Sequence, residues 1–233
     1  MITLYQYEIS PFCDKIRRIL NYKKLPYHIH EVSLLESVNG AYKKINPIGK
    51  VPAIDHDGRI VADSTHIANY IEEKYPQPPL IPTNKKDAAL VHMLEDWADE
   101  SLYFFEMYLR LAVPHNAERW IPEITKNEPF YMKLAAPKLI PAMLGKVAKT
   151  QGTGRKPLEM LSKEVYAHVK AVADWLADGS WLVGDAITLA DISVYSQLKC
   201  LEGTREGAFA LNDFPSVLSW MKRVDQATCV RSV

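Results

Sequence analysis

Apolar and polar residues alternate through the start of the chain in a pattern that changes from strand to helix. Residues 2–7 and 27–32 are rich in β-branched and aromatic side chains, which predicts two strands. Between them, residues 13–24 place Ile16, Ile19 and Leu20 on one side of a helix. Because a helix joins the two strands, we expect them to pair in parallel through a right-handed crossover.

A hairpin and a second helix follow. Residues 50–54 and 59–62 flank an Asp-Gly pair, which is typical of a tight hairpin turn. Pro52 lacks a backbone N–H, so it must lie at an edge, in a bulge or after a cis bond. Residues 64–75 repeat apolar positions at helical spacing. The first 76 residues therefore predict a βαβ unit followed by a ββα unit, a small α/β domain.

The rest of the chain predicts helices only. Four prolines between residues 76 and 82 indicate a linker, which we place at residues 77–82. Helical spacing recurs over residues 85–111, 158–176, 189–201 and 215–224. Thr188 and Asp191 form a capping box before the third of these helices, so we interpret Asp191 as structural. The predicted fold class is an α/β domain (1–76) followed by an all-helical domain (83–233).

Charge and cysteine content narrow the function. The chain has 28 basic and 28 acidic residues, so its net charge does not favour nucleic acid. Three well-separated cysteines predict neither a disulfide framework nor a metal cluster and fit a reducing compartment. The first residues enter a strand directly, without room for a signal peptide, and no apolar run approaches ~20 residues. We expect a cytoplasmic protein without a metal.

One segment departs from this balance. Between Phe130 and Leu158 there are six basic residues and no acidic one. Residues 130–156 could make a weak contact with an anionic membrane surface, form a solvated basic face, or cover the active site as a lid. Pro137 and Pro141 predict an interruption of any long helix in this segment.

The tetrapeptide Ser10-Pro11-Phe12-Cys13 lies at the predicted turn from strand to helix. It has the pattern of a thiol-redox turn whose first cysteine is replaced by serine. A helix N-terminus stabilises a nearby thiolate because its backbone N–H groups are unsatisfied. With Ser10 in first place, we expect a bound cofactor to supply that thiolate and the hydroxyl to donate to its sulfur. Cys13, one helical turn later, is the alternative nucleophile.

These motifs and their order resemble the cytosolic glutathione transferase superfamily over nearly the whole chain. The resemblance rests on Ser-Pro-Phe-Cys, on Val51-Pro52, on Asp63-Ser64 and on the Thr-Leu-Ala-Asp box at 188–191. Segments such as 4–7 and 25–27 also resemble membrane-associated prostaglandin E synthase type 2 and its bacterial relatives, which carry Cys-Pro-Phe-Cys. The resemblance implies a thioredoxin-like N-terminal domain, a helical C-terminal domain and a homodimer.

The resemblance also implies a glutathione site, residue by residue. Val51, before the cis-proline position, would pair its backbone with the cysteinyl part of the peptide. Ser64 and its helix N-terminus suit the γ-glutamyl carboxylate, and Asp63 suits the ammonium. Lys50 would meet the glycyl carboxylate, and Phe12 would pack beside the cofactor.

The function that follows is a glutathione transferase. Ser10 and the helix N-terminus would lower the pKa of the bound thiol, which is ~8.5 for an ordinary cysteine thiol. The thiolate would then attack a small hydrophobic electrophile. The predicted wall residues of the electrophile pocket are aromatic: Trp97, Tyr103, Phe104 and Tyr108. Two alternatives stay open, namely a thiol–disulfide oxidoreductase or isomerase that uses Cys13, and a non-catalytic glutathione-binding protein.

Overall fold

Four strands form one mixed sheet in the order β2-β1-β3-β4. In the computed structural model, which describes residues 1–229, β1 (Ile2–Gln6) pairs in parallel with β2 (Tyr27–Glu31). It pairs antiparallel with β3 (Ala53–His56), which continues through a hairpin into β4 (Arg59–Ala62). The predicted parallel crossover and hairpin are therefore confirmed.

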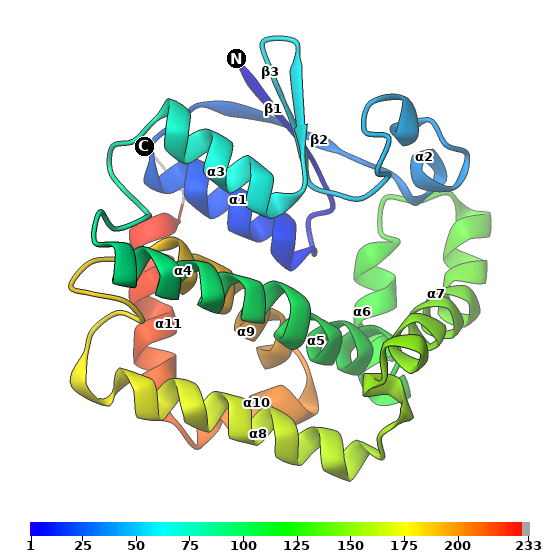
Figure 1. Cartoon of the computed structure of the whole chain (residues 1–233). Coiled ribbons are helices and arrows are strands. Elements are labelled where there is room, and N and C mark those ends of the chain that lie inside the picture. The colour runs from blue at the N-terminus through cyan, green and yellow to red at the C-terminus, as the bar shows by residue number, and fades with distance from the viewer. Residues whose placement is uncertain (230–233) are drawn as a thin grey trace.

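Two helices separate this sheet from the rest of the molecule. α1 (Pro11–Tyr22) and α3 (Ser64–Lys74) lie between the sheet and the helical domain, as Figure 1 shows. The short α2 (Leu34–Val38) and a 3-10 turn (η1, Tyr42–Lys44) follow β2. This βαβ–ββα arrangement confirms the predicted thioredoxin-like domain.

The second domain is entirely helical. Its elements are α4 (Lys85–Trp97), η2 (Ala98–Leu102), α5 (Tyr103–Leu111), α6 (Pro114–Ile124), α7 (Phe130–Gln151), η3 (Thr153–Arg155), α8 (Leu158–Trp175), η4 (Leu176–Asp178), α9 (Leu189–Glu202), α10 (Arg205–Asn212) and α11 (Pro215–Thr228). The helix expected over 85–111 consists of α4, a π-helical turn (η2) and α5. Residues 230–233 of the predicted helical domain lie outside the described residues.

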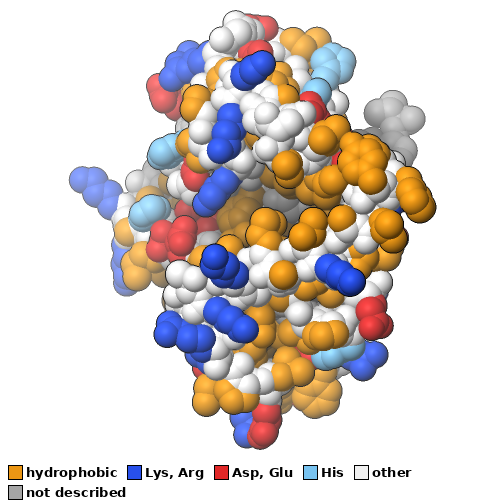
Figure 2. Space-filling model, turned by 90° about the vertical axis from the view of Figure 1, so that its right-hand side faces the viewer, with side chains coloured by type: hydrophobic (Ala, Val, Ile, Leu, Met, Phe, Trp, Pro, Cys, Tyr) orange, Lys and Arg blue, Asp and Glu red, His pale blue; other side chains and the backbone are white. Residues whose placement is uncertain are grey.

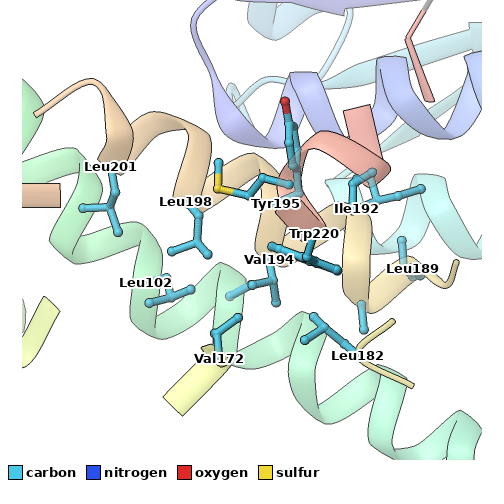
Figure 3. Close-up of a cluster of buried hydrophobic side chains, with 14 of the residues drawn as sticks. Leu102, Val172, Leu182, Leu189, Ile192, Val194, Tyr195, Leu198, Leu201 and Trp220 are labelled. Atoms are coloured by element: carbon cyan, nitrogen blue, oxygen red, sulfur yellow. The ribbon is translucent and has the colours of Figure 1, made fainter. Parts of the chain in front are cut away.

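α9 runs through the centre of the helical domain. Figure 3 shows its side chains Ile192, Val194 and Leu198 among apolar groups from α8, α11 and η2, and all three are inaccessible to solvent. Asp191 receives hydrogen bonds from the backbone of Thr188 and from Trp220 Nε1, both 2.9 Å long. The predicted capping box is present, and the structure assigns Asp191 to the core.

The proline-rich segment between α3 and α4 is held at Leu80 by hydrogen bonds to α3 and to α9. The backbone N–H of Leu80 donates to Glu72 at 2.9 Å, and the Leu80 carbonyl accepts from the backbone of Leu189 at 2.9 Å. The Leu80 side chain is buried in the core shared by both domains. The linker limits at 77 and 82 stay a prediction, but this segment is held against both domains.

The interruption expected at Pro137 and Pro141 is wrong. α7 continues through both prolines for 22 residues. A proline removes one backbone donor and clashes with the preceding turn. Where tertiary contacts hold the helix before and after the proline, the helix bends and does not end. α7 packs against α5 and α6, and it bends along its length in Figure 1.

Candidate functional site

A cavity of about 480 Å³ lies between the two domains. Figure 2 shows a hollow between the upper and lower halves of the molecule on this side. The sheet domain contributes mainly turns and helix N-termini, and the helical domain contributes α4, η2, α5 and the inner side of α7. Six of the seven predicted site residues line it: Ser10, Phe12, Lys50, Val51, Asp63 and Ser64.

Ser10 is the N-cap of α1. Its Oγ accepts a hydrogen bond from the backbone N–H of Cys13 at 3.4 Å, and its own N–H donates to the Tyr7 carbonyl at 3.1 Å. A hydroxyl that accepts from the helix keeps its proton available for a second partner. Ser10 can therefore donate to a group in the cavity, at the positive end of α1.

Cys13 is not brought into the cavity. Its side chain is fully buried and does not belong to the cavity lining. Burial raises the pKa of the Cys13 thiol to about 11, although the hydrogen bond with Ser10 opposes this shift. A thiol that is neither exposed nor ionised near neutral pH is a poor nucleophile, which weighs against the alternative based on Cys13.

The loop before β3 presents backbone groups to the cavity. The Val51–Pro52 bond is cis. The Lys50 carbonyl accepts from Asn46 Nδ2 at 2.7 Å and from the Tyr42 hydroxyl at 3.1 Å, which fixes the loop. Among residues 1–229, the N–H and carbonyl of Val51 have no hydrogen-bond partner. Val51 thus offers a donor and an acceptor to a ligand, and the exposed Lys50 lies at the rim.

Asp63 and Ser64 begin α3. Asp63 is the N-cap with a φ of 76°, and its Oδ1 accepts from the backbone of Thr65 at 3.0 Å and of His66 at 3.3 Å. The Ser64 hydroxyl is buried and donates to Asp99 Oδ2 at 3.3 Å. Ser64 is therefore tied to the helical domain, which the sequence did not indicate.

Beneath Ser64 lies a buried group of charges that sequence reasoning missed. Lys15 Nζ is paired with Glu95 and, at 2.7 Å, with Asp99, and it also donates to Ser64 at 3.3 Å. Burial works against the charged ammonium, yet Asp99 and Glu95 hold the pKa of Lys15 above its usual value. Burial raises the pKa of Asp99 to about 6 despite the nearby ammonium. One signal was available: Lys15 lies one turn before the apolar Ile19 on an amphipathic helix.

A second buried pair, also missed, forms part of the cavity wall on α5. Arg110 Nε lies 3.0 Å from Glu106 Oε2, and both side chains are almost inaccessible to solvent. Burial raises the pKa of Glu106 to about 7, against the attraction of the guanidinium. The i, i+4 spacing of these two charges within an apolar segment was the signal that could have identified them.

The predicted aromatic wall is half correct. Tyr103 and Phe104 line the cavity, and the Tyr103 ring lies 4.8 Å from that of Phe12. Trp97 and Tyr108 do not line it. Trp97 faces α8, where its ring centroid is 5.7 Å from that of His168, and Tyr108 packs against the main core. The remaining apolar wall comes from α6 and α7, through Ile124, Ile140, Met143 and Leu144.

The sequence matches two domain models of one family. Residues 4–79 match the glutathione S-transferase N-terminal domain, and residues 130–226 match the glutathione S-transferase C-terminal domain. With the thioredoxin-like and helical domains described above, these matches cover most of the chain. The chain belongs to the glutathione S-transferase family.

Relatives with known names match to different extents. The chain is 40% identical over 84 residues to probable maleylacetoacetate isomerase 1 of Drosophila melanogaster, a match that spans 34% of each chain. It is 25% identical over 247 residues to protein LigF of Sphingobium sp., covering all of this chain and 93% of that one. The likeness to prostaglandin E synthase type 2 is not confirmed by these matches and stays a prediction.

Solved structures share the fold. The crystal structure of the β-etherase LigF from Sphingobium sp. has a TM-score of 0.73, with 25% identity and coverage of 96% of this chain and 94% of that chain. A glutathione S-transferase from Rhodospirillum rubrum has a TM-score of 0.69, with 24% identity and coverage of 97% and 88%.

Two further observations bear on cofactors and membranes. Within residues 1–229, no three His, Cys, Asp or Glu side chains are grouped so that they could hold a metal ion. None of the helices in the same residues combines the length and apolar character that a bilayer crossing requires.

Proposed function

We propose that this cavity binds glutathione and that the chain activates the glutathione thiol for attack on a small apolar electrophile. The observation that supports this most is the meeting of three separate elements in one cavity. These are Ser10 at the N-terminus of α1, the unpaired backbone of Val51, and the Asp63–Ser64 N-terminus of α3.

Each element suits one part of the tripeptide. The N-terminus of α3 favours the γ-glutamyl carboxylate, and the Asp63 carboxylate favours the neighbouring ammonium. The Val51 backbone can pair with the cysteinyl peptide unit, as an added strand would. Lys50, exposed at the rim, suits the glycyl carboxylate. This orientation places the cysteinyl sulfur at Ser10.

The chemistry follows from that position. A hydroxyl donor and a helix N-terminus both favour the thiolate over the thiol. A shift of the thiol pKa from ~8.5 to ~7 raises the ionised fraction at neutral pH from a few per cent to about half. The thiolate then forms a bond to an electrophilic carbon, and the leaving group departs or an unsaturated bond takes up a proton. The role of Cys13 is confined to packing.

The second substrate is apolar. Phe12, Tyr103 and Phe104, together with the α6 and α7 side chains, supply an apolar wall, and the exposed acids Asp96 and Glu100 line another part of the cavity. The relatives' names bring two reaction types to this chain, the isomerisation of maleylacetoacetate and the cleavage of an ether. The test panel therefore contains maleylacetoacetate, an aryl ether and, as a general electrophile, a chlorinated dinitrobenzene.

The test is the absorbance of the glutathione thiolate on the protein as a function of pH. We expect a thiol pKa at least one unit below that of free glutathione in the wild type. Ser10→Ala should raise it, and Cys13→Ala serves as the matched control that leaves it unchanged. If the thiol pKa of glutathione bound to Ser10→Ala equals that of glutathione bound to the wild type, Ser10 has no part in the mechanism. Absence of glutathione binding would overturn the whole proposal.

We also propose a homodimer, on the basis of the family alone. Sedimentation equilibrium of the wild type over a wide concentration range tests it. A single species at the monomer mass of 26.5 kDa would contradict it.

A further inference from the structure

α7 exposes an unusual number of large apolar side chains. They are Phe130 (79% exposed), Tyr131 (58%), Leu134 (72%), Leu139 (62%), Met143 (61%) and Val147 (45%). We call these residues the α7 face. Single exposed apolar residues are ordinary, but six within 18 residues of one helix leave much apolar surface in contact with water.

The charges on this helix all have one sign. Lys133, Lys138, Lys146 and Lys149 are exposed, and the sequence from Pro129 to Leu158 contains no Asp or Glu. Within residues 1–229, none of these four lysines forms a salt bridge. Figure 2 shows basic and apolar side chains intermingled over the lower half of this side of the molecule.

The neighbouring helix α8 shows the contrasting arrangement. Its Lys163 pairs with Glu159 at 2.7 Å, and its Lys170 pairs with Asp174 at 2.6 Å. These two exposed lysines of α8 thus have acidic partners one turn away. The lysines of α7 lack acidic partners among the described residues. Lys133 Nζ donates to the Lys126 carbonyl at 2.7 Å, and the charges of Lys138, Lys146 and Lys149 are available to an external anion.

The α7 face also adjoins the mouth of the cavity. Ile140, Met143 and Leu144 line the cavity from α7, so Met143 belongs both to the lining and to the exposed face. On the sheet domain, Ile48 lines the same cavity and is 60% exposed. The apolar surface therefore continues from the outside of α7 into the cavity.

We propose that the α7 face docks on the surface of an anionic lipid bilayer. Its apolar side chains would enter the boundary between headgroups and acyl chains, and its lysines would meet lipid phosphates. A second copy of this chain fits less well, because a two-fold contact would set the lysines of one face against those of the other. The docking does not depend on the proposed reaction, but it would open the cavity towards lipid-soluble electrophiles.

The test is co-sedimentation of the full chain with vesicles. We expect binding to phosphatidylcholine vesicles that contain phosphatidylglycerol, no binding to phosphatidylcholine alone, and weaker binding as salt increases. Lys138→Gln with Lys146→Gln should weaken binding roughly thirtyfold. The matched control on α8, Lys163→Gln with Lys170→Gln, should bind as the wild type does.

A second pair of variants tests the apolar part. Leu134→Ser with Leu139→Ser should weaken binding while leaving its salt dependence in place, because the lysines remain. Glutathione affinity, measured in parallel, should be unchanged in every variant, which separates this proposal from the proposed function.

Several results would overturn the docking. These are equal binding to both vesicle types, an equal loss in the α8 control, and unchanged binding in the leucine variant. A dimer that dissociates in the α7 variants would assign the face to a second copy instead.

Discussion

Arg110 on α5 donates a hydrogen bond of 2.9 Å from Nη1 to the backbone carbonyl of Ile9, the residue immediately before Ser10. The same guanidinium is paired with Glu106, and both charges are buried in the helical domain. The turn that carries Ser10 is therefore positioned by a side chain one hundred residues further along the chain.

Replacing Arg110 should damage stability more than replacing the whole pair. Arg110→Met leaves Glu106 buried without a counter-charge and the Ile9 carbonyl without its donor, so we expect a loss of about 3–5 kcal/mol. The double variant Arg110→Met with Glu106→Leu should recover part of it, because no charge is left buried. Urea unfolding of the wild type and the two variants measures this, and a double variant no more stable than Arg110→Met would contradict the coupling.

Glu106 should also make stability depend on pH. Its pKa is raised from 4.5 to about 7 by burial, so the folded chain keeps a proton that the unfolded chain releases. Its contribution to stability is therefore fully present below pH 4.5 and is lost as the pH rises through about 7.

Glu106→Gln removes this titration. As the pH rises from 4 to 8, the wild type should lose on the order of 3 kcal/mol of unfolding free energy relative to Glu106→Gln. Glu159→Gln, an exposed site on α8, provides the control. Parallel stability curves for wild type and Glu106→Gln across this range would disprove the shift.

Asp63 caps the N-terminus of α3 and also carries the negative charge proposed to bind the glutathione ammonium. Two substitutions separate these two roles. Asn tolerates the φ of 76° and still accepts hydrogen bonds from Thr65 and His66, so Asp63→Asn should change stability by only a few tenths of a kcal/mol. Asp63→Ala should cost about 1 kcal/mol or more. Both should weaken glutathione binding if the carboxylate holds the ammonium. Calorimetric titration measures this, and an unchanged dissociation constant for Asp63→Asn would exclude that contact.

Cys13 should resist alkylation in the folded protein. It is fully buried and its pKa is raised to about 11, whereas Cys229 is exposed. Iodoacetamide followed by mass spectrometry of tryptic peptides should show rapid labelling at Cys229 and labelling at Cys13 only after denaturation. Equal rates at the two cysteines would restore the thiol–disulfide alternative.

The sequence was sufficient where chemistry is local. The placement of Ser10 at the start of a helix depends on a few neighbouring residues, while Val51-Pro52 and Asp63-Ser64 were implied by the resemblance, and the structure brings all three to one cavity. The Thr188–Asp191 box was equally readable, because its hydrogen bonds span three residues.

Sequence reasoning failed where partners are distant or where packing overrides propensity. Lys15 meets Glu95 of α4 and Asp99 of η2 only through the tertiary fold, because these carboxylates lie 80 and 84 residues later in the chain. The prolines of α7 bend a helix that neighbouring helices hold in place, so they do not end it. Which aromatic residues of α4 and α5 face the cavity depends on the π-helical turn between them, and periodicity alone does not reveal such a turn.

α1 has a consequence for how the two sequence domains behave as pieces. It carries Ser10 at its start, while Asp14 accepts from Ser196 on α9 at 3.0 Å and Arg18 donates to Thr228 on α11 at 2.8 Å. The helix that carries Ser10 is thus also the main attachment of the second domain. Cutting the gene at the linker would yield a first half with Lys15 uncompensated and an apolar surface uncovered. We therefore expect the two halves to unfold together as one cooperative unit.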